Sequence, residues 1–429
     1  MKTTLDRFRS RIGEFWWYSI ILFMAMRSAD LLNLFVGVWL VPKFISPDEL
    51  GAVLPLASFA ALLATPVSAF AMSFMKEITS LATAKEFGKM KALLSGVFAA
   101  ALVFLMLSIL LSRIAMPFFM DSIRIAEGSL GILILASGFI GAFAPVYVNA
   151  LQGLKKFREL SLLHVLCAPV RLLTMLVAMP FRPLSGYFAG QSASPATNIA
   201  LSVFFLRREL AVKADAYWRR PAVKRFLVLF LLILAYQLSA AMLGFAEQTV
   251  FRRNLPNAET AAFYMLTRFS DILGFVSGVL LAVLFPYTAE AAERGESLRP
   301  LVIKTAAAII AAGILLSSFF AIAGKWMLAV LPGGETNASF AWALPALTGI
   351  NILFQLQCLY TNTEASAARF GFLKWWIPLN LILPFALLWI SPSSIASLIA
   401  YLALAAAVKF AFSLCGFLSS ASRSQRTAP

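Results

Sequence analysis

Charged residues are scarce in this sequence. They make up 13% of the 429 residues, whereas hydrophobic residues make up 61%. A soluble domain of this length needs a far more polar surface, so the composition excludes that class and indicates a membrane protein. The short alternating segments of transmembrane β-strands are missing too. Because backbone groups in lipid must be hydrogen-bonded internally, we predict that every membrane span is a helix.

Residues and motifs of common enzymes are also missing. The sequence has one histidine and three cysteines, and Cys167, Cys358 and Cys415 lie in apolar stretches without the spacing of a disulfide or metal site. It contains neither a G-x-x-x-x-G-K-[ST] phosphate loop nor an H-E-x-x-H motif. The predicted outer loops are short, the longest covering roughly residues 113–129, so they hold no soluble active-site domain. We expect a protein that is not an enzyme and that needs no cofactor and no metal.

Long apolar runs dominate what is present. Hydropathy and length predict about twelve spans of roughly 20 residues. The sixth is the most polar and contains glycines at 186 and 190, a spacing typical of close packing between membrane helices. The predicted spans cover residues 17–41, 53–75, 93–112, 130–150, 162–180, 184–206, 226–246, 262–286, 305–323, 340–360, 372–390 and 395–418.

Lysine and arginine are distributed unevenly between the connecting segments. About 25 of them fall in one set of segments, which includes both termini, against roughly 7 in the alternate set. The positive-inside rule therefore predicts that both termini are cytoplasmic. The net charge of +16 is accounted for by this topology and by attraction to anionic membrane lipids. No basic cluster belongs to a soluble domain, so we expect no nucleic-acid partner.

The most polar segment, residues 207–225, separates six predicted spans from six. A weak internal similarity supports this halving: matching Glu49 to Glu259 relates "SPDELGAVLPL" to "LPNAETAAFYM", about half the chain further on. We predict an all-α polytopic protein with an N-terminal lobe at 1–206, a basic cytoplasmic linker at 207–225 and a C-terminal lobe at 226–429. Because sites in such proteins lie at the interface of the repeats, we expect a central cavity between the lobes.

Several charged residues fall inside predicted spans, where each costs about 2.5–3.5 kcal/mol at the bilayer centre. A spacing of three places the members of each of two Arg–Asp pairs on one helical face. Asn33 follows the first pair by one turn, and Gln237 aligns with Arg27 in the repeat. We expect both to face the same cavity as the charges. The charged residues are Arg27, Asp30, Arg171, Arg268, Asp271 and Lys409.

Two interpretations of these charges are open. In the structural one, each Arg–Asp pair neutralises itself and holds helices together. In the functional one, the residues line a water-filled cavity that contacts a charged cargo. Arg171 and Lys409 have no acid within a helical turn, so the interior charge is net positive and favours an anionic cargo. Lys409 has a second interpretation, because its long side chain can reach the cytoplasmic surface.

Three stretches, taken together, resemble a known family. They are "FISPDELGAVLPLASF" after the first span, "LQGLKKFRELS" after the fourth, and "LPNAETAAFYMLTRFSDILGFVSGVLLAVLFP" entering the eighth. The last is the most specific, with Tyr264, Arg268 and Pro286 in order. The chain resembles the polysaccharide (O-antigen type) flippases of the multidrug/oligosaccharidyl-lipid/polysaccharide exporter superfamily. Such exporters often have fourteen spans, and here about twelve are predicted.

The resemblance implies a flippase in the bacterial inner membrane that moves a polyprenyl-diphosphate-linked oligosaccharide by alternating access. Arg27, Arg171 and Arg268 would contact the diphosphate, for which the fork of arginine donors is well suited. Asp30 and Asp271 would either couple ions or pair charges. The membrane potential or an ion gradient would supply the energy, since no nucleotide site is present.

The resemblance also implies a monomer in contact with membrane lipids and with glycan polymerase or assembly proteins. A multidrug exporter of the same fold is the alternative, although its cavity would favour acids and aromatic residues. A membrane-embedded glycan polymerase or ligase is less compatible, because such enzymes need a long outer loop. A structural partner subunit is a further alternative.

Overall fold

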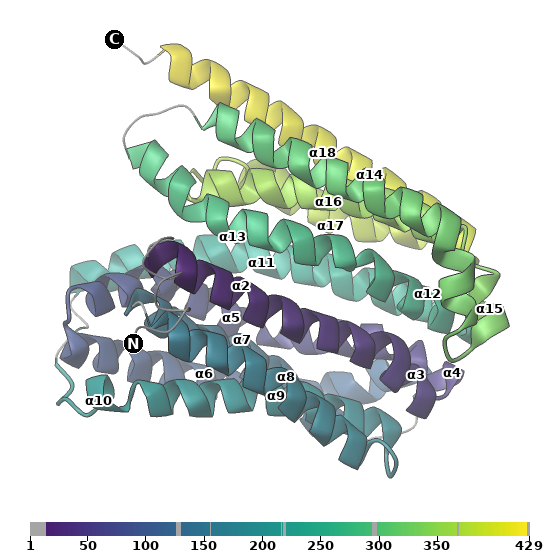
Figure 1. Cartoon of the computed structure of the whole chain (residues 1–429), viewed down its shortest axis with the longest axis horizontal. Helices are drawn as coiled ribbons and strands as arrows, with labels where there is room; N and C mark the ends of the chain where they lie inside the picture. The colour runs from purple at the N-terminus through teal and green to yellow at the C-terminus, as the bar shows by residue number, and fades with distance from the viewer. Residues whose placement is uncertain are drawn as a thin grey trace, which may run out of the picture. The chain divides into compact units, whose positions relative to one another are not determined.

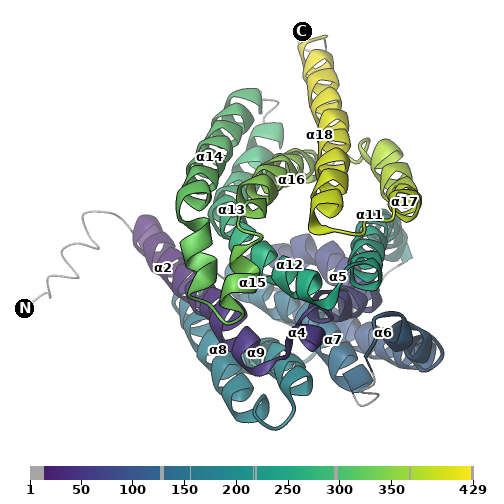
Figure 2. The ribbon, with the colours of Figure 1, turned by 90° about the vertical axis from the view of Figure 1, so that its right-hand side faces the viewer.

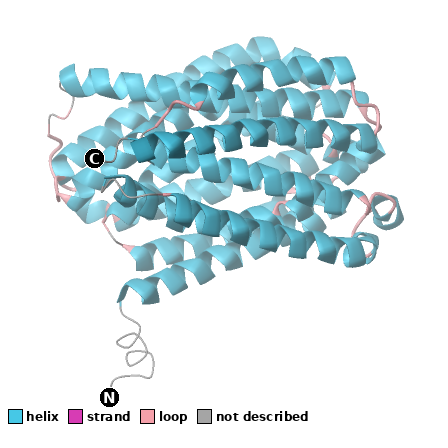
Figure 3. Cartoon of the chain, turned by 90° about the horizontal axis from the view of Figure 1, so that it is seen from above, coloured by secondary structure: helices cyan, strands magenta, loops and turns pink. Residues whose placement is uncertain are grey.

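The computed structural model describes residues 14–125, 130–154, 156–215, 217, 220–293, 298–366 and 369–426. Within these ranges the regular structure is helical, without strands (Figures 1 and 3). Ten of the described helices are long and apolar enough to cross a membrane. This confirms the predicted all-α polytopic fold. The two ends of the chain lie outside the described residues, and their cytoplasmic location stays a prediction.

The two remaining predicted spans correspond to further helices. The sixth is α9 (Pro183–Phe205), and the eighth is α12 (Asn257–Ser270) followed directly by α13 (Ile272–Glu293). Nine of the residues of α9 are serine, threonine, asparagine, glutamine or glycine, a composition typical of a helix that packs against other helices. The eighth span is discontinuous at Asp271, which the hydropathy pattern did not predict.

The chain forms two compact units, each built from two stretches of sequence. Unit 1 comprises Met1–Val36 and Leu56–Ala241. In it, α8 packs against both α2 and α9, and α7 packs against α9. Its helices are α2 (Glu14–Phe35), α5 (Val53–Thr83, from Leu56), α6 (Phe87–Ser122), α7 (Leu130–Gly153), α8 (Phe157–Ala178), α9, α10 (Arg207–Leu210) and the first part of α11 (Arg220–Asn254).

Aromatic packing attaches the beginning of α11 to α5 in unit 1. The rings of Phe74 and Phe226 stack with their centroids 4.2 Å apart, and Phe70 meets Phe226 and Phe230 edge to face at 5.3 and 5.6 Å. Offset and edge-to-face pairs stabilise such contacts beyond the burial of apolar area. This cluster fixes the helix that carries Gln237.

The beginning of the predicted linker is also fixed to unit 1. The Lys156 ammonium lies 2.8 Å from the Glu209 carboxylate and donates to the carbonyl of Phe205 at 2.8 Å. Further along, the backbone N–H of Asp215 donates to the carbonyl of Gly88 at 3.1 Å. Tyr217 hydrogen-bonds Glu77, and burial together with that carboxylate raises the pKa of its phenol. The predicted division at 207–225 concerns membrane lobes and stays a prediction.

Unit 2 comprises Gly37–Pro55 and Met242–Pro429. A short segment of the N-terminal half, α4, packs against α12, and α16 lies between α14 and α18 (Figure 2). Its elements are the π-helix η1 (Val36–Leu40, from Gly37), α3 (Val41–Phe44), α4 (Pro47–Leu50), the end of α11, α12, α13, α14 (Arg299–Ala329), α15 (Gly334–Ala338), α16 (Ala343–Ser366), α17 (Leu373–Ile390) and α18 (Ile395–Arg426).

Close packing of α8 and α9 depends on the glycine pair predicted from the sequence. A Cβ atom built on Gly186 would lie 2.5 Å from the backbone nitrogen of Met179, and one on Gly190 would lie 2.3 Å from Cγ of Met175. Real Cβ atoms essentially never approach other atoms this closely, and a backbone neighbour cannot rotate away. The predicted small-residue contact is therefore confirmed.

We expect Gly186→Val to destabilise unit 1 strongly, because its side chain would force α8 and α9 apart. Overpacking of this kind costs about 1–3 kcal/mol or more. The measurement is the thermal unfolding midpoint of purified protein in detergent. Gly141→Val is the matched control on α7, where a Cβ would meet nothing within 4 Å. Equal midpoints for the two variants would contradict the packing argument.

Candidate functional site

A row of polar side chains on α2 begins the candidate site in unit 1. The guanidinium of Arg27 lies 2.9 Å from the carboxylate of Asp30, three residues later. Both side chains are mostly buried, with 21% and 28% exposed. The guanidinium also lies 5.7 Å from the ring centre of Phe23. The predicted pairing of Arg27 with Asp30 is therefore present.

Arg171 joins this row from α8. Its Nη1 donates to Oδ1 of Asn33 at 3.0 Å, so two predicted residues that lie far apart in sequence are in direct contact. His164, about two turns earlier on α8, interacts electrostatically with Asp30. The α2–α8 interface therefore holds two arginines and one aspartate in unit 1, together with a neutral amide.

A cavity of about 580 Å³ opens beside Arg171, lined by residues of α5, α7, α8, α9 and α11 that all belong to unit 1. Its walls are made mostly of alanine, serine and glycine side chains. Among the described residues that line it, Arg171 is the only charged one. Gln237 also lines it, so the structure brings these two predicted residues to one cavity.

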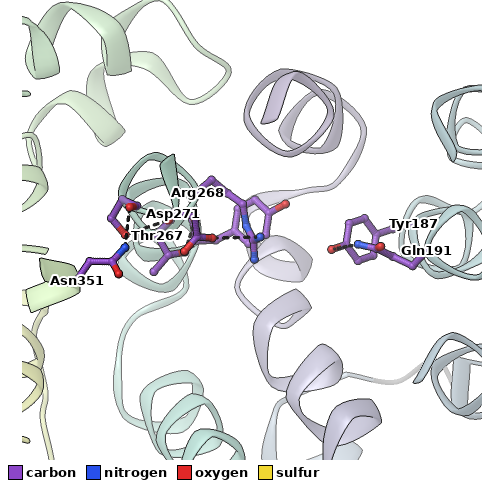
Figure 4. A network of polar contacts seen from close by, with 8 residues as sticks. Tyr187, Gln191, Thr267, Arg268, Asp271 and Asn351 are labelled. Carbon is purple, nitrogen blue, oxygen red and sulfur yellow. Dashed lines mark hydrogen bonds and ion pairs between the residues drawn. The ribbon is translucent and has the colours of Figure 1, made fainter. Parts of the chain in front are cut away.

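Two residues of α9 add polar groups that the sequence analysis did not single out. Nε2 of Gln191 donates to the hydroxyl of Tyr187 at 2.7 Å (Figure 4), and both residues line the cavity. The low hydropathy of the sixth span was the available signal. Low hydropathy alone does not distinguish a helix that lines a polar cavity from one that packs closely on its neighbour. Close packing of α8 and α9 also requires small residues in place of large apolar side chains.

The second predicted pair lies in unit 2, at the discontinuity between α12 and α13. The guanidinium of Arg268 lies 3.5 Å from the carboxylate of Asp271 and 5.1 Å from the ring centre of Tyr264. The aliphatic part of Arg268 packs on η1, because a Cβ on Gly37 would lie 3.3 Å from its Cδ. Short π-helical segments occur frequently at functional sites.

The break in the eighth span is stabilised from α16. Ser270 is the last residue of α12, and its carbonyl accepts a hydrogen bond from Nδ2 of Asn351 at 2.7 Å (Figure 4). Gln355 donates to Asn351 at 3.1 Å and accepts from Ser277 on α13 at 2.7 Å. These bonds satisfy a backbone carbonyl released by the break, as membrane helices require. Asn351 and Gln355 of α16 therefore hydrogen-bond to the two helices that flank the break.

Lys409 on α18 has an acidic neighbour on another helix of unit 2. It interacts electrostatically with Glu247 of α11, whose carboxylate accepts a hydrogen bond from Tyr401 at 3.1 Å. Its ammonium also lies 5.5 Å from the ring centre of Trp376. Charge pairing therefore accounts for Lys409 within unit 2. Sequence spacing missed this pair because the two residues are on different helices.

Within the described residues, no group of three or more histidine, cysteine, aspartate or glutamate side chains could hold a metal ion. The three cysteines carry free thiols, and Cys167 is buried. The site chemistry consists of guanidinium groups, carboxylates, amides and hydroxyls, which bind and orient polar ligands.

The fold is that of known membrane transporters. An inward-facing multidrug resistance MATE family transporter of the MOP superfamily is 15% identical, with a TM-score of 0.69, covering 95% of this chain and 99% of that one. MATE in the bent conformation is 15% identical, with a TM-score of 0.63 and 95% of each chain covered. The inward closed lipid II flippase MurJ is 11% identical, with a TM-score of 0.67, covering 95% and 91%.

The sequence matches no family model and no curated protein. At these identities the structural likeness establishes a fold shared with transporters of the MOP superfamily, and no more.

Proposed function

We propose that this protein is a flippase that moves a lipid-linked oligosaccharide, joined through a phosphate or diphosphate, across the cytoplasmic membrane by alternating access. The observation that carries the proposal is the charge of the unit 1 cavity. Arg171 is the only charged residue among its described lining residues. A guanidinium beside a polar cavity that has no acidic residue among its described lining suits a phosphate that is attached to a neutral polar group.

Irregular backbone in two spans supports the same function. The first span changes from α-helix to π-helix at Val36, and the eighth breaks at Asp271. Each carries an arginine and an aspartate three residues apart. Broken helices in transporters commonly form substrate sites, because irregular backbone is tolerated where it lines a polar cavity. Arg27 and Arg171 of unit 1 would then contact an anionic group, as would Arg268 of unit 2, while Asp30 and Asp271 limit the excess positive charge within their own units.

Multidrug export is the second candidate, favoured by the MATE transporters that share the fold. A cavity that binds organic cations needs acidic side chains to offset their charge. The described lining of the unit 1 cavity contains none. The membrane potential or an ion gradient would drive either process.

A two-substrate transport assay tests the proposal. In proteoliposomes, we expect the protein to transfer a prenyl-diphosphate-linked oligosaccharide between leaflets and to leave ethidium untransported. Arg171→Gln should lower glycan-lipid transfer at least tenfold, because a charge-assisted contact is worth about 1.5–3 kcal/mol. Arg171→Lys should retain part of the rate, since it keeps the charge but loses the forked geometry. Transport of ethidium without transfer of the glycan lipid would establish the second candidate instead.

A further inference from the structure

Resting on the proposed function, we propose that the unit 1 cavity is a saccharide subsite that binds the sugar attached directly to the phosphate. The cavity of about 580 Å³ lies in the size range of pockets for small organic ligands, about 300–1,000 Å³. It therefore accommodates the first part of a glycan. The support comes from the hydrogen-bonding groups of its walls, from their lack of acidic charge and from the position of Arg171.

Hydroxyl groups on α5 and α7 present acceptors to the cavity. Thr65 donates to the carbonyl of Ala61 at 2.8 Å, and Ser137 donates to the carbonyl of Ile134 at 2.8 Å. Since each hydroxyl proton is used in its own helix, the oxygen lone pairs are left to accept from a ligand. Both residues line the cavity.

The amides and the phenol complete this set. Because Gln191 donates to the oxygen of Tyr187, the phenolic proton is available for another acceptor. On α11, Oε1 of Gln237 is buried and has no hydrogen-bond partner among the described residues. A buried amide oxygen without a partner is destabilising, so a ligand donor is favoured there. Sugar hydroxyls both donate and accept, which matches walls that offer both functions.

The position of Arg171 determines where the phosphate and the sugar of the ligand would lie. It lines the cavity and simultaneously donates to Asn33 in the polar row of α2. Its guanidinium thus lies between the hydroxyl-rich cavity and the row that contains Arg27 and Asp30. A phosphate bound there directs the sugar that it carries into the cavity.

Gly141 offers a way to fill the cavity without disturbing the helices. It lines the cavity on α7, and a Cβ built on it meets nothing within 4 Å. Gly141→Leu therefore reduces the space for a ligand, and replacing glycine in a helix also favours the helical state. Gly349→Leu is the matched control, at an equally open glycine on α16 of unit 2 outside this cavity.

Binding of defined probes tests the subsite. The probes are farnesyl diphosphate and its glucosyl, galactosyl and N-acetylglucosaminyl derivatives, titrated calorimetrically against the full-length protein in nanodiscs. We expect at least one glycosylated probe to bind the unmodified protein tenfold or more tightly than the bare diphosphate. Gly141→Leu and Gln191→Leu should remove that preference and leave binding of the bare diphosphate within twofold, whereas Gly349→Leu should retain it.

The possible outcomes distinguish failure of the saccharide subsite from failure of the proposed function. If all four probes bind equally, or if the preference survives in folded Gly141→Leu and Gln191→Leu proteins, the saccharide subsite is overturned while the proposed function stands. If no probe binds the unmodified protein, the proposed function fails, and the subsite fails with it. Thermal unfolding of each variant establishes that it is folded before titration.

Discussion

Arg268→Ala is expected to lower glycan-lipid transfer by roughly 10–100-fold, the cost of losing a charge-assisted contact worth about 1.5–3 kcal/mol. Arg268 stands at the break of the eighth span, beside Asp271 and against the ring of Tyr264. Arg268→Lys should retain an intermediate rate, because an ammonium keeps the charge without the paired donors of a guanidinium. The measurement is transfer in proteoliposomes, normalised to the amount of folded protein.

The double variant Arg268→Ala/Asp271→Ala distinguishes binding from charge balance. If Arg268 serves only to neutralise Asp271, removing both charges relieves the cost of a stranded carboxylate and restores transfer. If Arg268 binds the phosphate, the double variant folds as well as the unmodified protein but stays inactive. Recovery of transfer in the double variant would therefore establish the structural interpretation of this pair.

The second large effect is expected on stability, at Arg252 of α11. This side chain is 2% exposed. It donates to Asn257 at 2.7 Å, to Thr260 at 3.0 Å and to the carbonyl of Asp48 at 2.6 Å. Arg252→Ala should cost about 3 kcal/mol or more, because it removes charge-assisted hydrogen bonds and leaves buried acceptors unsatisfied. A large fall in the unfolding midpoint in detergent, and a lower yield from membranes, are the expected results.

Arg253→Ala provides the control for this prediction. Arg253 is the next residue of the same helix, carries the same charge and is exposed. Surface substitutions usually change stability by no more than about 0.5 kcal/mol. Similar losses for the two variants would show that the buried hydrogen bonds of Arg252 do not hold α4 against α12.

Local sequence spacing predicted the parts of the site that lie within one helix. Arg27 with Asp30, and Arg268 with Asp271, are three residues apart and form ion pairs. The glycines of α9 were recognised for the same reason. Hydropathy likewise predicted the helical, polytopic fold, because a helix that crosses lipid needs a long apolar run whatever its neighbours are.

Contacts between helices were not predictable in this way. Asn33 and Arg171 are separated by 138 positions, and nothing in either segment indicates that α2 packs on α8. The same holds for Glu247 and Lys409. The break at Asp271 was missed because the whole span is long and apolar enough to cross the membrane as one helix, and the stabilising amide of Asn351 comes from another helix. Tertiary packing decides these features.

Unit 2 draws residues 37–55 from the early part of the chain and the remainder from residue 242 onward. During synthesis, this early segment leaves the ribosome about 190 residues before the polypeptide that completes its unit begins to appear. At about 5–20 residues per second, the delay is on the order of ten to forty seconds. The hydrogen bond between the carbonyl of Asp48 and Arg252 cannot form before Arg252 has been synthesised. α4 is therefore synthesised well before α12, the helix against which it packs. A gene divided after residue 225 would consequently yield a C-terminal fragment that lacks α4 and cannot assemble alone.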